Sequence, residues 1–296
     1  MQLKPIAILL ALATVGCRAG EPKTNAEKLG YPAGKRILML HADDVGMCEE
    51  ANLATARLLE ADQIQSAAIM MPCPKAEEFI KWAIAHPGED LGMHLTLTSE
   101  WKDYRWEPVA PSNEVPGLID GEGKLWPTVA EVIQHASTEE VEKEIRAQID
   151  RAIALGYRPN HIDTHMGALY GCTDYVEVFF RVAEDYGIPA NAMELSDPKV
   201  VAKYRSLGYP IDECTIELAN QYALPRLDAF SYIDSADTYD VKVENFKTQI
   251  RALSPGLTEL IFHPSMESDH LKSLTHAWRQ RVWELKMFSD PEVVQF

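Results

Sequence analysis

Short apolar runs of strand length alternate with amphipathic stretches of helical length along most of this chain. The apolar runs predict seven strands, at Arg36–Ala42, Ser66–Met71, Asp90–Leu97, Asn160–Met166, Ile188–Met193, Ala229–Asp234 and Glu259–His263. Several of these runs are apolar at nearly every position, which is typical of a parallel sheet covered on both faces. About seven such βα units predict an α/β fold, a distorted parallel (β/α) barrel or a near relative of one.

The stretches between the strands carry the spacing and the end signals of helices. They predict helices at Glu49–Ala61, Lys75–Ala85, Thr138–Leu155, Asp174–Tyr186, Pro198–Leu207, Val241–Leu253 and His270–Phe288. We expect Ser137 and Thr173 to cap two of these helices at their N-termini. The pattern predicts no element for Tyr209–Leu227. The stretch Thr98–Pro127 is a long polar and aromatic insertion, and insertions of this length tend to be functional loops.

The first residues have the pattern of an export signal. Ile6–Val15 is an apolar run of the right length for a signal-peptide core and too short to span a bilayer. It leads into Thr14-Val15-Gly16-Cys17, which resembles a bacterial lipobox. We therefore predict a signal peptide at 1–17, a lipid anchor at Cys17, a tether at 18–34 and a folded domain at 35–296, with an ordinary secreted precursor as the alternative. The protein is then exported to the periplasm or the cell surface, and it touches the membrane only through this anchor.

Charge and cysteine content exclude some classes of partner. The chain has 45 acidic and 28 basic residues and a formal net charge of -17, which argues against a nucleic-acid partner or an anionic membrane surface. The cysteines beyond the signal peptide show no paired spacing and no C-x-x-C motif: Cys48, Cys73, Cys172 and Cys214. We expect buried free thiols, and a disulfide is the open alternative because an exported compartment permits one.

Titratable side chains gather at the ends of four predicted strands. The first strand ends at Asp43 and Asp44, and His94, His165 and His263 stand at or near the ends of three others. The carboxyl ends of strands are where barrels and open α/β sheets build their sites. Two carboxylates held this close raise the pKa of one of them unless a cation binds. Taken singly, the aspartates would be a turn and a helix cap, and each histidine a hydrogen-bonded core residue.

The fourth predicted strand favours a metal site over these simpler explanations. His161, Asp163 and His165 share one face of it at i, i+2 and i+4, and three such groups inside a barrel are costly unless paired or bound to a metal. Two histidines and one carboxylate form an open metal site. A metal there activates water and polarises a carbonyl, a second carboxylate takes a proton, and a further histidine protonates a departing amine. This set suits hydrolysis of an amide or ester, and G-x-S-x-G, Walker A and G-x-G-x-x-G motifs are absent.

Four blocks resemble the signature blocks of the YdjC-like family, which includes chitooligosaccharide deacetylases: His41-Ala42-Asp43-Asp44-Val45-Gly46, Gly92-Met93-His94-Leu95, His161-Ile162-Asp163-Thr164-His165 and His263-Pro264. The later segment Arg281–Leu285 also resembles the C-terminal helix of that family. The resemblance covers the chain from Arg36 to its end. It implies a deacetylase-like and glycoside-hydrolase-like barrel as the catalytic domain. The implied reaction is metal-dependent removal of N-acetyl groups from amino-sugar oligosaccharides.

The resemblance also implies roles for individual residues. By motif position, the ligands of a divalent metal ion would be Asp44, His94 and His165. Asp43 would be the general base and His263 the general acid. Asp163 would either orient a metal ligand or the acid, or be a buried structural carboxylate, and His161 would be structural. Ligand softness favours Zn²⁺, whereas the resemblance points to Mg²⁺ or another divalent ion, and to a homodimer.

Departures from the family pattern bear on the substrate. His41 stands where the family usually has Asn, and Ala190-Asn191-Ala192 stands where a basic residue is common. The aromatic residues of the insertion either stack on sugar rings or hold the loop down, and we expect one or two near the substrate: Trp101, Tyr104, Trp106 and Trp126. Two other functions stay open, a metal hydrolase of another acyl ester or amide and a non-catalytic surface glycan-binding lipoprotein.

Overall fold

The computed structural model describes residues 24–296. The predicted signal peptide, the lipid anchor at Cys17 and the first part of the tether lie outside the described residues, so export and anchoring stay predictions of the sequence. Within the described part of the chain, no helix combines the length and the apolar character needed to cross a membrane.

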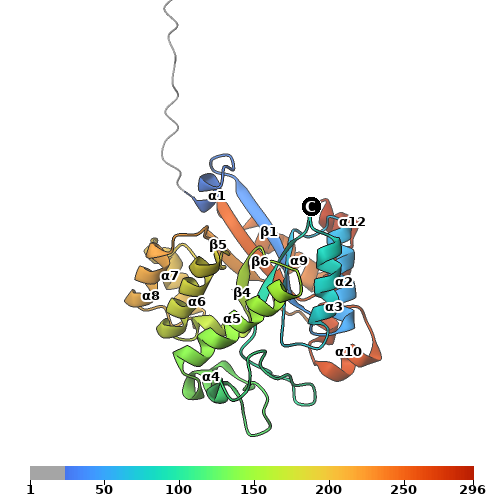
Figure 1. The fold of residues 1–296 in the computed structure, drawn as a ribbon. Coiled ribbons are helices and arrows are strands. Elements are labelled where there is room, and N and C mark those ends of the chain that lie inside the picture. The colour runs from blue at the N-terminus through green and yellow to red at the C-terminus, as the bar shows by residue number, and fades with distance from the viewer. Residues whose placement is uncertain (1–23) are drawn as a thin grey trace, which may run out of the picture.

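Six strands form one parallel sheet in the order β4-β3-β2-β1-β6-β5. Their bounds are β1 Arg36–Val45, β2 Ser66–Ile69, β3 Asp90–Leu95, β4 Ile162–Thr164, β5 Ala229–Tyr232 and β6 Gly256–Phe262. The last five residues of β1, which lies between β2 and β6, are all buried. Helices lie on both sides of the sheet (Figure 1), which confirms the predicted α/β fold of the parallel barrel type.

The prediction of about seven strands is wrong by one, because Ile188–Met193 forms no strand. This stretch makes one parallel bridge from Ala190 to β4 and another from Met193 to Leu227, just before β5. It therefore lies where a seventh strand would close the barrel. Pro189 within it has no N–H to donate, which interrupts a regular ladder. The barrel wall is consequently irregular between β4 and β5.

Twelve helices surround the sheet in the described residues: α1 Asn25–Lys28, α2 Glu49–Glu60, α3 Ala76–Ala85, α4 Val129–His135, α5 Thr138–Ala154, α6 Thr173–Tyr186, α7 Pro198–Ser206, α8 Glu213–Gln221, α9 Tyr239–Arg251, α10 Asp269–Leu274, α11 Trp278–Phe288 and α12 Pro291–Val294. Two 3₁₀ turns, η1 Pro116–Leu118 and η2 His165–Tyr170, complete the elements. Helices α2 and α3 lie on one side, and α6, α7 and α8 gather on the opposite side (Figure 1).

Several helix boundaries differ from the predictions. Helix α8 lies in the stretch for which the sequence predicts no element, and the Asp212 side chain caps it. The predicted last helix is divided into α10 and α11, since Thr275 between them has an extended backbone. Ser137 caps α5 in a capping box with Glu140, as predicted. Thr173 is not a cap, because it is the first residue of α6 and its hydroxyl donates to Asp212 instead.

Part of the predicted tether packs against the folded domain. Helix α1 lies within the range 18–34, and the backbone N–H groups of Asn25 and Ala26 donate to the carboxylate of Asp228 at 2.8 and 3.0 Å. The same carboxylate accepts the N–H of Leu257 at the start of β6. Asp228 therefore joins the N-terminal segment to the sheet.

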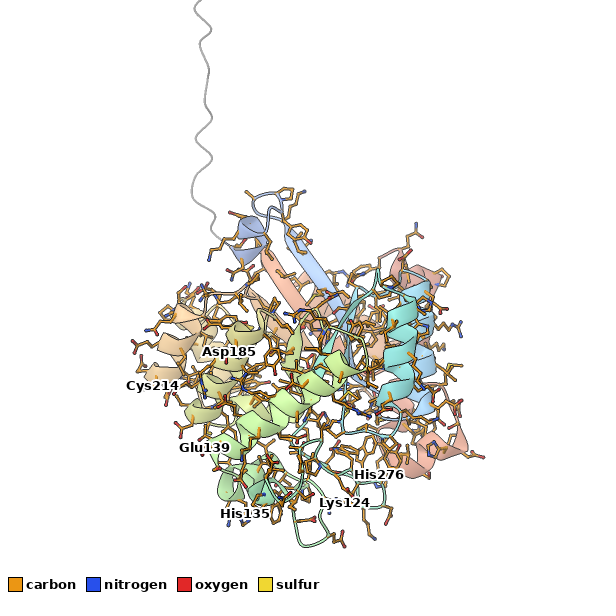
Figure 2. The ribbon with its side chains drawn as sticks, in the orientation of Figure 1. Lys124, His135, Glu139, Asp185, Cys214 and His276 are labelled. Carbon is orange, nitrogen blue, oxygen red and sulfur yellow. The ribbon has the colours of Figure 1, made fainter. Side chains whose placement is uncertain are left out.

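The four cysteines of the described chain are free thiols, as predicted, but the predicted burial is wrong for Cys172, which is partly exposed, and for Cys214. Cys48 and Cys73 are buried, whereas Cys214 is exposed on α8 and lies at the outer edge of the molecule in Figure 2. Burial raises the pKa of the Cys48 thiol to about 12. This thiol is therefore protonated and unreactive at neutral pH.

A buried carboxylate of α5 holds the long insertion against the barrel. The side chain of Glu144 accepts the N–H groups of Val109 and Ala110 at 2.9 and 2.8 Å, and it is fully buried. Trp106 is also buried and donates its indole N–H to the carbonyl of Thr98 at 2.8 Å. Trp126 donates likewise to the carbonyl of Gly117. These two rings therefore hold the loop down.

Replacing Glu144 by Ala is expected to lower the free energy of unfolding by about 1–3 kcal/mol, because one buried and one partly buried backbone N–H group lose their acceptor. Urea unfolding of the two proteins measures the difference. Glu139→Ala is the control, since Glu139 is exposed at the start of the same helix (labelled in Figure 2) and contributes less than about 1 kcal/mol. Equal losses in the two variants would show that Glu144 does not anchor the insertion.

Candidate active site

The two aspartates at the end of β1 face one cavity because of an unusual backbone turn. On a regular strand, neighbouring side chains point to opposite faces. Asp44 has a φ of 61°, in the left-handed region that residues other than glycine rarely adopt. The chain then turns at Gly46, where φ is 90° and a Cβ would lie 2.8 Å from the Cα of Ala76. Asp43 and Asp44 therefore both line a cavity of about 380 Å³.

Asp44, His94 and His165 bring three potential ligand atoms together in this cavity. Oδ1 of Asp44 lies 3.6 Å from Nε2 of His94 and 3.3 Å from Nδ1 of His165, and the two nitrogens are 3.3 Å apart. All three side chains are buried. These are the residues that the family motifs imply as metal ligands.

A carboxylate holds the other ring nitrogen of each histidine. His94 Nδ1 lies 2.6 Å from Oδ1 of Asp163, and His165 Nε2 lies 3.2 Å from Oε2 of Glu100. With the N–H of each neutral ring directed at its carboxylate, both remaining nitrogens present lone pairs to each other and to Asp44 Oδ1, which has no hydrogen-bond partner. In this neutral state the three lone pairs converge without a donor and repel one another. A divalent cation fits among them, and carboxylates behind the ligands are typical of metal sites.

Two further groups of side chains in the described residues are close enough to hold an ion, and both include Asp163. Both oxygens of this carboxylate already pair with histidine nitrogens, at His94 and His41. The group at Asp44 is therefore the one of the three that does not depend on a carboxylate already paired with histidines at both oxygens.

Charges around the site set the pKa values of its ligands. Burial lowers the pKa of His165, but the carboxylates of Glu100 and Asp44 outweigh it and raise this pKa to about 10. For Asp44, burial favours the neutral acid, yet the positive charges of Arg281 and His263 hold its pKa well below the usual range. Without a metal, a proton on His165 occupies the place of the cation.

Metal affinity is therefore expected to rise with pH, by up to about tenfold per unit between neutral pH and the pKa of His165, because the metal displaces a proton from that ring. Titration of the metal-free protein with Zn²⁺ in buffers of different ionisation enthalpy measures both affinity and proton release. The raised pKa also stabilises the metal-free fold below pH 6.5, and this contribution is lost as the pH rises through about 10. Affinity that is independent of pH, with no proton released, would contradict this assignment.

Strand register explains why Asp163 lies between two histidines. His94 and Asp163 are partners across β3 and β4, so their side chains stand side by side. The second oxygen of Asp163 lies 2.9 Å from Nε2 of His41. His41 in turn pairs in register with Ser66 of β2, with its Nδ1 2.9 Å from the Ser66 hydroxyl. These contacts favour the orienting role for Asp163, the first of the two that the sequence leaves open.

Asp43 and His263 lie beside the three ligand atoms and also line the cavity. Oδ2 of Asp43 is 4.0 Å from Nε2 of His263, and Oδ1 of Asp43 is 3.2 Å from Nε2 of His41. The side chain of Asp43 is 4% exposed, whereas that of His263, just after β6, is 35% exposed. The site thus has a buried carboxylate on its inner side and a histidine on its open side.

Three residues of this region were not predicted to belong to the site. Arg281 of α11 donates to Oδ2 of Asp44 at 2.6 Å, and Glu100 holds His165. Glu259 of β6 is buried beside His41, and burial raises its pKa to about 7 against the charge of His41, which lowers it. The resemblance of Arg281–Leu285 to the C-terminal helix of the family could have indicated Arg281 as a site residue. No spacing pattern in the sequence marks Glu100 or Glu259.

The remaining predicted residues lie away from the cavity. His161 pairs with Asp90 at 3.2 Å and packs edge-on against His41, which agrees with a structural role. None of the four aromatic residues of the insertion lines the cavity; Trp101 lies nearby, under the guanidinium of Arg281 at 5.8 Å. The aromatic side chains that do line it come from other elements: Tyr170, Phe180, Tyr204, Tyr209, Phe230 and Tyr232.

The fold and the site together define a parallel α/β barrel with a candidate metal centre at the carboxyl ends of its strands. Comparison with known proteins identifies the family. The YdjC-like protein family matches residues 37–296, and the chain belongs to this family.

Relatives agree with this assignment over most of their length. A carbohydrate deacetylase of Thermus thermophilus is 31% identical over 276 residues, which cover 90% of this chain and 91% of the relative. A carbohydrate deacetylase of Brevibacillus brevis is 27% identical and covers 88% of this chain and 93% of its own. A crystal structure from Enterococcus faecalis, described as a cellobiose-phosphate cleavage protein, shares the fold with a TM-score of 0.71 at 22% identity, over 89% of this chain and 94% of that one.

Proposed function

We propose that this protein is a carbohydrate deacetylase that uses a divalent metal ion, Mg²⁺ or Zn²⁺, to remove N-acetyl groups from amino-sugar oligosaccharides. The observation that carries the proposal is the convergence of three potential ligand atoms, on Asp44, His94 and His165, beside Asp43 and His263. Relatives that carry the name carbohydrate deacetylase supply the substrate class.

The residues around the candidate ligands have separate roles in amide hydrolysis. A divalent ion held by Asp44, His94 and His165 supplies Lewis-acid activation of water and of the acyl carbonyl. Asp43 accepts the proton of the attacking water, whose oxygen forms the new C–O bond. His263 donates a proton to the nitrogen as the C–N bond breaks, so that the sugar leaves as a neutral amine.

The surrounding contacts suit Asp43 and His263 to these roles. His41 lies 3.2 Å from one oxygen of Asp43 and leaves the other facing the cavity toward His263. The partial exposure of His263 places the leaving amine, and the sugar that carries it, on the open side of the cavity. Asp163 and Glu100 keep the rings of His94 and His165 oriented with their free nitrogens inward.

The test is acetate release from N-acetylglucosamine oligomers by the full chain, before and after chelation and after addition of Mg²⁺ or Zn²⁺. Release that a chelator stops and a divalent ion restores would support the proposal. His165→Ala is expected to lose bound metal, whereas His276→Ala is the matched control because His276 is exposed between α10 and α11 (labelled in Figure 2).

Two outcomes would overturn this assignment. Acetate release that is unaffected by chelation would show that the reaction does not require a metal. No release with any divalent ion, from protein that binds one, would exclude the N-acetyl sugars. Hydrolysis of a simple acyl ester by the same preparation would then favour the alternative hydrolase.

A further inference from the structure

The cavity continues beyond the metal centre into a part that we call the apolar wing, lined by Tyr170, Phe180, Leu195, Tyr204, Ala219 and Phe230. Every charged residue that lines the cavity is a candidate metal ligand, a carboxylate partner of one, Asp43, His263 or Arg281. The lining therefore divides into a charged part, where the reaction takes place, and the apolar wing.

The irregular barrel wall accounts for this wing. Between β4 and β5 the stretch 188–195 replaces a regular strand and makes only two isolated bridges. Behind it lie α6, α7 and α8, which gather on this side of the sheet (Figure 1). They contribute Phe180, Tyr204 and Ala219 to the lining. The cavity thus reaches from the barrel interior to helices that a closed wall would separate from it.

The polar atoms of the wing are already committed to the protein. The hydroxyl of Tyr170 donates to the carbonyl of Asn191 at 3.1 Å. The hydroxyl of Tyr204 donates to the carbonyl of Phe230 and accepts the N–H of the same residue, both at 2.8 Å. The rings consequently offer apolar surface to the cavity. Sugar hydroxyls placed here would lose water without gaining partners, whereas a hydrocarbon chain would be stabilised.

We propose that the apolar wing binds the hydrocarbon chain of an N-acyl group longer than acetyl, so that the substrates include amino sugars carrying medium-length acyl chains as well as N-acetyl sugars. This inference rests on the proposed function and deepens it. The amine must meet His263 on the open side, so the sugar lies there and the acyl chain extends inward. The oxygen of water forms the C–O bond as the C–N bond breaks. The products are a carboxylate, whose chain occupies the wing, and an amine that takes its proton from His263.

The first test compares N-acetyl-, N-butanoyl-, N-hexanoyl- and N-octanoylglucosamine as substrates of the full chain loaded with Zn²⁺ or Mg²⁺. Release of free amine reports the same event for every chain length. The expected result is a kcat/KM that rises about fourfold for each added methylene until the wing is filled.

The second test fills the wing. Ala219→Leu adds a branched side chain from α8 into the lining, and the ratio of hexanoyl to acetyl kcat/KM is expected to fall at least tenfold. Ala202→Leu is the matched control, since Ala202 is exposed on the neighbouring helix α7, and its ratio stays at the wild-type value.

A binding measurement keeps the inference testable if Ala219→Leu fails to fold. Calorimetry of the wild-type, metal-free protein with the same series follows binding without turnover. Tighter binding and a more negative heat-capacity change with each longer chain are expected, because apolar surface is buried.

The outcomes separate the two proposals. Hydrolysis of the acetyl compound, with a kcat/KM that falls as the chain lengthens, would overturn the proposal that the apolar wing binds acyl chains. The proposed deacetylase function would be unaffected. The same conclusion would follow if Ala219→Leu and Ala202→Leu changed the ratio of hexanoyl to acetyl kcat/KM equally and binding were independent of acyl-chain length. No hydrolysis of any member, from protein that binds the metal, would overturn the proposed function and this inference with it.

Discussion

Replacing Asp43 by Asn is expected to lower kcat by about 10²- to 10⁴-fold while the metal content of the protein stays at the wild-type level. Asn has the shape of Asp but cannot accept the proton of water. The three ligand atoms belong to other residues, and Asp43 contacts the ligand set only at 3.8 Å, from Oδ1 to Nδ1 of His94. Steady-state rates and metal analysis of the same preparation measure both quantities.

The matched control for this variant is Asp90→Asn. Asp90 is a carboxylate of β3 that pairs with His161, and it does not line the cavity. Its replacement is expected to leave kcat within about twofold of the wild type, since substitutions away from such sites have small effects. A wild-type rate in Asp43→Asn would show that Asp43 is not the base. Loss of the metal together with the rate would make Asp43 a support of the metal centre instead.

Replacing Asp44 by Asn is expected to remove the metal, abolish turnover and lower the free energy of unfolding of the metal-free protein by about 3–5 kcal/mol. The third effect arises because Arg281, which is also buried, loses the carboxylate that it contacts at 2.6 Å. Breaking one side of a buried ion pair leaves the other charge without compensation. Asn adopts the left-handed backbone more readily than most residues, so the φ of 61° adds no strain.

A double-mutant cycle separates the ion pair from the metal site. Adding Arg281→Met to Asp44→Asn removes the unpaired charge, and this double variant is expected to recover at least half of the lost stability. Metal binding and turnover stay lost, since the ligand oxygen is still absent. Urea unfolding of the four chelated proteins gives the coupling energy. Additive effects of the two single changes would show that the pair does not stabilise the fold.

Local sequence patterns predicted the positions of the candidate catalytic side chains along the chain. A strand buried on both faces is apolar throughout, so Asp43, His94 and His263 at or near strand ends stood out against it. Parallel strands bring their carboxyl ends to one edge, and the structure does place these residues with His165 in one cavity. The capping box at Ser137 was predictable for a similar reason, because its parts lie within one helical turn.

The number of strands could not be predicted from local sequence patterns alone. The stretch Ile188–Met193 has the length and composition of a strand, and it lies where a strand would close the barrel. Whether it forms a ladder depends on N–H and C=O partners supplied by β4 and by the chain before β5, and only two bridges form. The apolar wing exists because this stretch does not form a regular strand.

The sequence by itself determined the class of fold, the order of the elements and the chemical character of the site, because each is carried by residues close together in the chain. Tertiary structure alone decided which side chains contact the candidate metal ligands. Glu100 meets His165 across 65 positions, His41 meets Asp163 across 122, and Arg281 meets Asp44 across 237. It also decided that neighbouring aspartates share a face, through the backbone turn at Asp44. Such contacts depend on strand register and helix packing, and these are set by the burial of the whole core rather than by any local pattern.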